Sequence, residues 1–108
     1  MVVSKVYDFA LWLLQKVEGF PRSYRFSVGD RLVSTVLDLL ILLVEAAYTT
    51  DKAAALAQAG RQANALRYRI RLSKDLRLLT LDSYKFASGQ LEAVSRMIGG
   101  WQKWAGKR

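Results

Sequence analysis

The chain contains no cysteine and no histidine. Without cysteine it has no disulfide framework, no thiolate nucleophile and no thiolate metal ligand. Without histidine it lacks the commonest general base and the commonest neutral metal ligand. Its 9 acidic residues show no pairing pattern typical of acid–base catalysis. We therefore expect no enzymatic activity, no metal and no cofactor.

Proline is also scarce, since Pro21 is the only one, and no segment alternates apolar and polar residues as a strand does. Apolar residues recur instead at helical spacing. The 108 residues suffice for one hydrophobic core. We predict an all-α fold in a single domain, residues 1–108, with helices at roughly 3–18, 27–48, 51–78 and 81–104. Short loops favour an antiparallel up-down four-helix bundle.

Capping residues mark the predicted helix boundaries. Gly19 and Pro21 end the first helix, because glycine favours a helix C-cap and proline cannot continue a helix. Ser27 resembles the N-cap of the second helix, with an acidic residue three positions later as in a weak capping box. Asp51 and Thr80 are expected to cap the third and fourth helices.

Long apolar runs free of charge are missing too. The best candidate for a membrane span, residues 32–48, carries Asp38 and Glu45 and is shorter than the roughly 20 residues that a span needs. The first residues lack the pattern of a signal peptide, because Asp8 interrupts the apolar run. We expect a cytoplasmic protein with no membrane association.

Positive charge is abundant: 17 Lys+Arg against 9 Asp+Glu give a net charge of +8. Such an imbalance favours nucleic acid or another anionic partner. Arg67, Arg71 and Lys74 share one face of the third predicted helix, with Arg77 beside them, and they lack acidic partners at helical spacing. Solvation of a charged face is the alternative interpretation. The candidate binding residues are Arg22, Arg25, Arg67, Arg71, Lys74 and Arg77, and the expected binding is phosphate-directed, salt-sensitive and independent of sequence.

Arg69 differs from these residues because it falls on the apolar face of its helix. An unpaired buried guanidinium is costly. Arg69 must extend to solvent, pair with an acid such as Asp38 or Glu45, or lie at a subunit boundary.

Several helices carry apolar residues that one bundle core does not account for: Trp12, Leu42, Phe86, Met97 and Trp104. Aromatic side chains of this kind bury about 150–250 Å² each and are unfavourable in water. Helix rotation could hide some of them. We expect them instead to form the interface of a homo-oligomer.

Three sequence blocks together resemble a known family. They are Phe20-Pro21-Arg22-Ser23, Leu66-Arg67-Tyr68-Arg69-Ile70-Arg71-Leu72 and Met97-Ile98-Gly99-Gly100-Trp101. In this order, in a basic helical chain of this length, they look like Avd, the accessory variability determinant of diversity-generating retroelements. The wider superfamily includes four-helix proteins encoded in intervening sequences of 23S ribosomal RNA genes.

The resemblance implies a four-helix bundle that assembles into a basic pentameric ring without enzymatic activity. It implies association with a reverse transcriptase and its template RNA or cDNA in support of mutagenic retrohoming. The block with Arg67, Arg69 and Arg71, followed by Lys74 and Arg77, matches the family's cationic third helix. Two alternatives stay open, an intervening-sequence-type protein of RNA-linked function and a purely structural helical oligomer.

Overall fold

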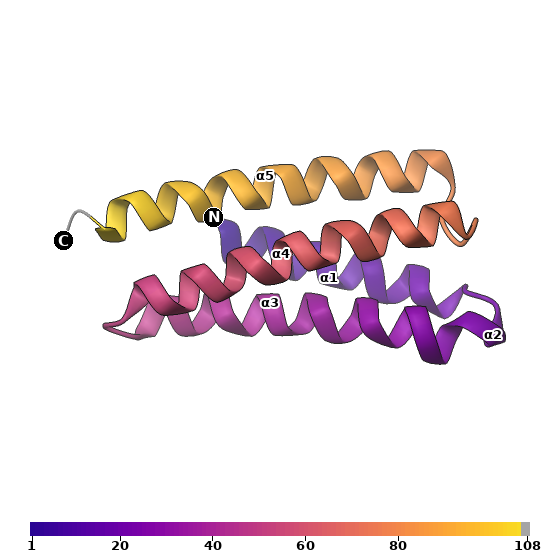
Figure 1. Cartoon of the computed structure of the whole chain (residues 1–108), viewed down its shortest axis with the longest axis horizontal. Coiled ribbons are helices and arrows are strands. Elements are labelled where there is room, and N and C mark those ends of the chain that lie inside the picture. The colour runs from indigo at the N-terminus through magenta and orange to yellow at the C-terminus, as the bar shows by residue number, and fades with distance from the viewer. Residues whose placement is uncertain (107–108) are drawn as a thin grey trace.

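The computed structural model describes residues 1–106, and these contain four long α-helices and no strand. The long helices are α1 (Val2–Glu18), α3 (Asp30–Tyr48), α4 (Lys52–Asp75) and α5 (Leu81–Gly106), as Figure 1 shows. A short helix, α2 (Arg22–Tyr24), and a π-helical turn, η1 (Arg25–Gly29), lead into α3. The prediction of an all-α fold is confirmed.

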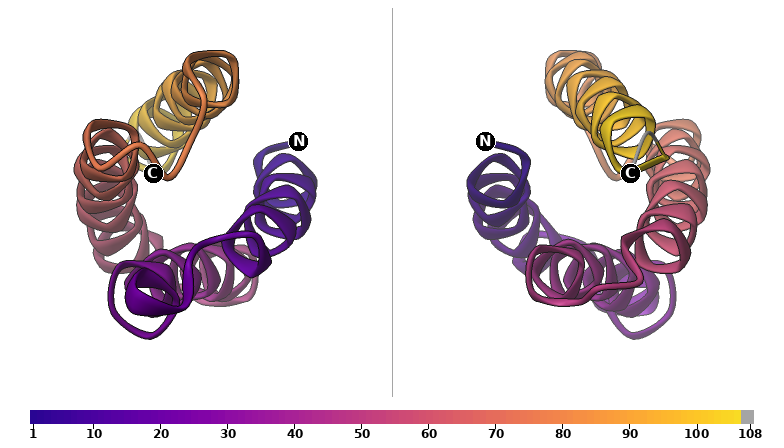
Figure 2. Two further views of the ribbon diagram at one scale, coloured as in Figure 1. Left: turned by 90° about the vertical axis from the view of Figure 1, so that its right-hand side faces the viewer. Right: turned by 90° about the vertical axis from the view of Figure 1, so that its left-hand side faces the viewer.

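Consecutive long helices run antiparallel along a body of 47 × 22 × 19 Å (Figure 1). Viewed from the end, α3 lies between α1 and α4, and α4 lies between α3 and α5 (Figure 2). The chain thus forms the expected up-down-up-down four-helix bundle, in which neighbours in sequence are neighbours in space. Within residues 1–106, no helix combines the length and apolar character needed to cross a membrane.

Each long helix buries one apolar face in a shared core. Leu13, Leu39, Leu66 and Leu91, one from each helix, are at most 1% exposed. On α5 the buried residues are Ala87, Leu91, Val94 and Ile98, which recur at the helical spacing seen in the sequence. The periodicity of the sequence therefore located this core face correctly.

The core face of α1 agrees with the helical spacing of Val6, Ala10, Leu13 and Val17, which are buried, but not with that of Tyr7. Tyr7, which helical spacing placed in the core, is 54% exposed, whereas Phe9 is 2% exposed. Phe9 stacks on the neighbouring Trp12, and Trp12 in turn contacts Phe86 of α5. Spacing alone could not choose between these faces, because α1 carries apolar residues on both.

Ser27 is not the N-cap of a helix, contrary to the prediction. The chain turns helical directly after Pro21, whose carbonyl accepts from the backbone N–H groups of Tyr24 and Arg25. Ser27 lies inside η1 and donates its hydroxyl to the carbonyl of Tyr24 at 3.4 Å. The α-helical geometry of α3 begins only at Asp30. The π-helical turn inserts an extra residue where the sequence suggested a simple boundary.

The predicted N-caps of α4 and α5 are confirmed, but the C-terminus of α4 lies earlier than predicted. Asp51 caps its N-terminus by accepting from the N–H of Ala54 at 3.4 Å, as expected. Thr80 likewise caps α5 by accepting from the N–H of Ser83 at 3.0 Å. The C-terminus of α4 lies at Asp75, short of the predicted residue 78.

A Schellman motif ends α4. The N–H of Leu78 donates to the carbonyl of Ser73 at 2.8 Å, and the N–H of Arg77 donates to that of Lys74 at 2.9 Å. Arg77 occupies the position that usually holds glycine, with φ 63°, and it is the only residue other than glycine with positive φ among residues 1–106. The sequence does not reveal this helix end because no glycine or asparagine marks it.

Candidate nucleic-acid interface

Arg67 and Arg71 stand one turn apart on the exposed surface of α4. Among residues 1–106, neither guanidinium forms an ion pair or a hydrogen bond with another side chain. Both lie on the flank of α4 that faces α5, because Lys74, on the same helical face, reaches the ring of Tyr84 in α5. These two guanidinium groups are free to contact an anionic ligand.

Lys74 is less available than its neighbours. Its ammonium nitrogen lies 4.6 Å from the centre of the Tyr84 ring and 3.4 Å from the carboxylate of Asp75. The side chain is 32% exposed. Lys74 therefore helps to hold α4 against α5 in addition to contributing charge to the surface.

Arg77 lies beyond the end of α4, so it does not continue the helical face as predicted. Its side chain is exposed in the turn between α4 and α5, close in sequence to Lys74. The structure thus places the candidate cations Arg67, Arg71 and Lys74 together on α4, with Arg77 at its end.

Arg22 and Arg25 lie apart from α4 in the segment that follows α1. Arg22 is exposed in α2. The guanidinium of Arg25 donates to the carbonyls of Glu18 at 3.2 Å and Phe20 at 3.3 Å. These carbonyls lie at and just beyond the C-terminus of α1, where a positive charge also interacts favourably with the helix dipole. Arg25, predicted only as a binding residue, therefore also stabilises the fold.

Arg69 lies on the opposite flank of α4, against α3. Its guanidinium donates to the hydroxyl of Thr35 at 2.9 Å, and that hydroxyl donates to the carbonyl of Arg31 at 2.6 Å. No ion pair joins Arg69 to Asp38 or Glu45 among the described residues. Of the three possibilities for Arg69, pairing with an acid is thus not realised. Instead, the side chain of Arg69 is half-buried and donates a hydrogen bond to Thr35.

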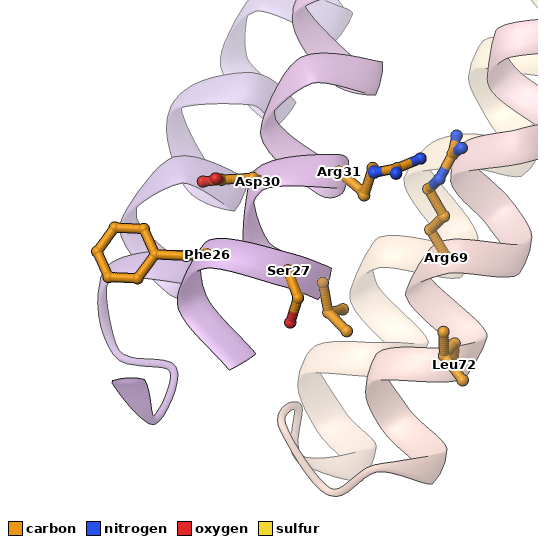
Figure 3. Close-up of a pocket in the computed structure, with 7 residues that line it drawn as sticks. Phe26, Ser27, Asp30, Arg31, Arg69 and Leu72 are labelled. Carbon is orange, nitrogen blue, oxygen red and sulfur yellow. The ribbon is translucent and has the colours of Figure 1, made fainter. Parts of the chain in front are cut away.

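A hollow of about 520 Å³ opens beside Arg69, between η1, the start of α3 and α4 (Figure 3). Arg31 and Arg69 extend toward one another across it, while Ser27 and Leu72 lie lower on its walls. Arg31 was not among the residues predicted from the sequence. A usable signal existed, because Arg31 and Thr35 are four residues apart and so share a face of α3.

Trp12 and Phe86, both predicted to lie at an oligomer interface, contact each other within one chain. Their ring centroids are 4.9 Å apart, and Trp12 also stacks on Phe9 at 5.7 Å. The ammonium of Lys16 lies 5.6 Å from the Trp12 ring. This cluster joins α1 to α5, the two helices at the ends of the arc in Figure 2.

The other predicted interface residues also face neighbouring helices. Met97 packs on the core and lines a shallow hollow with residues of α1. Phe86 and Met97 therefore lie on the flank of α5 that faces α1, and not on the side opposite the core. Leu42 packs on the core near α4, and Trp104 lines a hollow at the start of α4. Phe86 and Trp104 remain about half exposed, at 46% and 48%.

A different apolar surface is exposed on α1 and α3. Tyr7 and Leu11 lie on the flank of α1 away from Trp12, and Leu37 lies on the side of α3 away from Thr35, whereas Ile41 lines a hollow that α3 shares with α4. Because Trp12 faces α5 and Thr35 faces α4, Tyr7, Leu11 and Leu37 lie on the outer side of the α1–α3 pair, and Ile41 lies at its border with α4. These side chains, with Tyr48, are 40–88% exposed. We call this set the α1–α3 apolar face: Tyr7, Leu11, Leu37, Ile41 and Tyr48.

No group of three or more Asp or Glu side chains among residues 1–106 is arranged to hold a metal ion. The described residues thus form an all-helical bundle that presents several guanidinium groups and apolar side chains on its surface. A family model described as bAvd-like matches residues 1–105. The chain therefore belongs to the bAvd-like family. Neither a curated protein nor a solved structure matches it.

Membership in this family confirms the resemblance seen in the sequence. At the level of the family, the protein is a non-catalytic accessory protein of diversity-generating retroelements.

Proposed function

We propose that this protein binds the reverse transcriptase and the template RNA or cDNA of its retroelement through a basic surface, in support of mutagenic retrohoming. The surface consists of Arg67, Arg71 and Lys74 on α4, with Arg77 in the following turn and Arg22 and Arg25 at the other corner of the bundle. The observation that carries the proposal is the pair of exposed guanidinium groups of Arg67 and Arg71, which form no ion pair within residues 1–106.

Guanidinium groups suit this task because they bind phosphate oxygens through two parallel hydrogen bonds. Such contacts fix the position of a strand without reading its sequence. A protein with a net charge of +8 also attracts polyanions over a distance that salt shortens. The protein would therefore hold template and enzyme together and perform no chemistry of its own.

Self-association, as a pentameric ring, is part of the same proposal because it repeats the basic surface around the assembly. The predicted interface residues Trp12, Phe86 and Met97 already have partners within the chain. The α1–α3 apolar face is the better candidate for the contact between copies, since its aromatic and aliphatic side chains are 40–88% exposed. Leu42, beside α4, and Trp104, on α5 near the start of α4, remain separate candidates.

RNA binding at increasing salt tests the nucleic-acid part. We expect Arg67→Gln/Arg71→Gln to weaken binding and to lower the slope of log affinity against log salt by about 0.7–0.9 for each phosphate that the variant no longer neutralises. Lys85→Gln/Lys103→Gln on α5 is the matched control, because it removes two exposed charges from another helix. Absence of binding by the wild type at about 50 mM salt would contradict the proposal.

Two further measurements test the partners. The wild type should co-purify with the reverse transcriptase encoded beside it, and Arg67→Glu/Arg71→Glu should not, while circular dichroism remains helical. For self-association, Leu37→Gln/Ile41→Gln should lower the mass measured by light scattering. A basic bundle that keeps its full mass but binds neither RNA nor enzyme would favour the alternative of a purely structural helical oligomer.

A further inference from the structure

Two arginines from different helices meet over the hollow between η1, α3 and α4. Arg31 comes from the first turn of α3 and Arg69 from the middle of α4 (Figure 3). Both line the same space of about 520 Å³. Their guanidinium groups point toward each other across it, although like charges repel.

No carboxylate neutralises this pair. The ion pairs among residues 1–106 include neither Arg31 nor Arg69. Asp30 also lines the hollow, but its carboxylate points away from α4, on the far side of the segment from both guanidinium groups (Figure 3). Two cations are therefore brought together without an internal anion.

Arg69 is held in place for this arrangement. One of its terminal nitrogens, Nη1, donates to the Thr35 hydroxyl at 2.9 Å, and Thr35 is 3% exposed. The hydroxyl in turn donates to the backbone carbonyl of Arg31 at 2.6 Å, which fixes the orientation of the hydroxyl that Arg69 contacts. The remaining N–H groups of Arg69 and all those of the Arg31 side chain stay free of protein acceptors among the described residues. A preorganised guanidinium loses less conformational entropy when it binds an oxyanion.

We propose that this hollow is a phosphate-binding site in which Arg31 and Arg69 clamp one phosphate group between them. Two guanidinium groups supply a fork of N–H donors that matches the oxygens of a phosphate. The expected source is one phosphate of a bound RNA strand, and this part rests on the proposed function. The alternative source of the same chemistry is free phosphate.

The site is separate from the basic surface of the proposed function. Arg67 and Arg71 share the α5 flank of α4 with Lys74, which contacts Tyr84. Arg69 lies on the α3 flank, where it donates to Thr35. An RNA strand that contacts both flanks must cross the outer face of α4. Tyr68, 61% exposed, stands on that outer face. The two basic sites would thus fix two points along one strand.

Titration with inorganic phosphate tests the site itself. The side-chain Nε–H signals of Arg31 and Arg69 in ¹H–¹⁵N NMR spectra should shift together and saturate, compared with sodium chloride at equal ionic strength. Arg61, an exposed arginine on the same helix as Arg69, supplies an internal control signal that should not saturate. A shift of Arg69 no larger than that of Arg61 would overturn the proposal.

Arg31→Gln is the informative variant because it removes one arm of the clamp and leaves the bond from Arg69 to Thr35 intact. It should abolish the saturable shift of Arg69. Arg31→Lys keeps the positive charge but loses the planar set of N–H donors of the guanidinium. It should retain only part of the phosphate affinity. Equal phosphate affinity in wild type and Arg31→Gln would also overturn the proposal.

RNA titrations distinguish the two sources. Arg31→Gln should weaken RNA binding about tenfold and lower the salt slope by about 1, whereas Arg61→Gln should change affinity less than about twofold. If Arg67→Gln/Arg71→Gln weakens RNA binding but Arg31→Gln behaves like Arg61→Gln, the proposed function stands and the RNA source is wrong. If the wild type binds phosphate but no RNA, the site stands with free phosphate as its ligand and the proposed function fails.

Discussion

Arg77 adopts a backbone conformation that L-residues with a side chain usually avoid. Its φ of 63° places it in the left-handed region, where a Cβ approaches the following carbonyl oxygen. Glycine at this position would close the same Schellman motif without that cost. An exposed arginine retained at a strained helix end points to a use for its charge.

Replacing Arg77 by glycine should therefore separate stability from binding. We expect Arg77→Gly to raise the free energy of unfolding by about 1 kcal/mol, because the left-handed conformation costs an ordinary residue about 1–2 kcal/mol. The same variant should weaken RNA binding. Urea denaturation and RNA titration measure the two effects.

Arg77→Ala is the matched control for this variant, since it removes the charge and keeps the backbone strain. It should weaken RNA binding as Arg77→Gly does and leave the unfolding free energy nearly unchanged. RNA affinity equal to that of the wild type in both variants would remove Arg77 from the binding surface.

Arg25 illustrates how a cation of the proposed binding surface can also stabilise the fold. Arg25→Ala should lower the free energy of unfolding by about 1 kcal/mol, because the carbonyls of Glu18 and Phe20 lose their donor. Arg22→Ala, three residues earlier and without such bonds, should change it by less than about 0.5 kcal/mol. Thermal unfolding of the two variants measures the difference, and equal values would contradict the capping role.

Among the elements, the π-helical turn η1 sets the direction from which α3 enters the bundle. It ends at Gly29, which is buried, and a Cβ at this position would lie 2.8 Å from Cγ1 of Val17 in α1. Valine is stiff at its first side-chain torsion and cannot easily move aside. The close approach of η1 to α1 therefore depends on glycine.

Alanine substitutions at two glycines should consequently have opposite signs. Gly29→Ala should destabilise the protein by about 1–3 kcal/mol through overpacking. Gly89→Ala, in the interior of α5, should stabilise it by about 0.5–1 kcal/mol through helix propensity, because outside its chain neighbours and the nearby helix backbone no atom lies within 4 Å of the added Cβ. Chemical denaturation of both variants provides the test, and stabilisation by Gly29→Ala would refute the close packing.

Helical periodicity predicted the elements well and their junctions poorly. The apolar spacing of α5 and the capping residues Asp51 and Thr80 are local signals, and they were interpreted correctly. Ser27 carries the same local signal but lies within η1, because the contact of Gly29 with α1 decides the backbone there. Such contacts join residues distant in sequence, and local patterns contain no information about them.

At the scale of the whole molecule, the contact between α1 and α5 closes the bundle. Figure 2 shows these two helices at the ends of the arc, and Trp12 and Phe86 meet between them. The sequence identified both residues as apolar side chains in need of a partner. It could not show that each is the partner of the other, because a helical wheel does not show which flank faces which helix.

A double-mutant cycle tests this contact. Trp12→Ala should destabilise the protein by about 3 kcal/mol and Phe86→Ala, which is half exposed, by less. The coupling energy between them should be about 0.5–1.5 kcal/mol, as measured for aromatic pairs. Light scattering on the same variants reports the oligomer, and additive effects on stability with a reduced mass would place both residues between subunits instead.

The candidate site was predicted only in part for the same reason. Arg67 and Arg71 stand out in the sequence because they are neighbours on one helix. Arg31 and Arg69 lie on different helices, and only the packing of α3 against α4 brings them to one hollow. The sequence showed that Arg69 was unusual, but it did not contain the position of Thr35, which holds it.

The order of the helices around the bundle also bears on how the chain folds. Because each long helix packs on the one before it, most native contacts are local in sequence, and such topologies fold in microseconds to milliseconds. Synthesis by the ribosome is far slower, at about 5–20 residues per second. α1, α3 and α4 can therefore assemble in turn while the chain is still being made. The contacts of α5 form last, among them that of Tyr84 with Lys74 and that of Phe86 with Trp12.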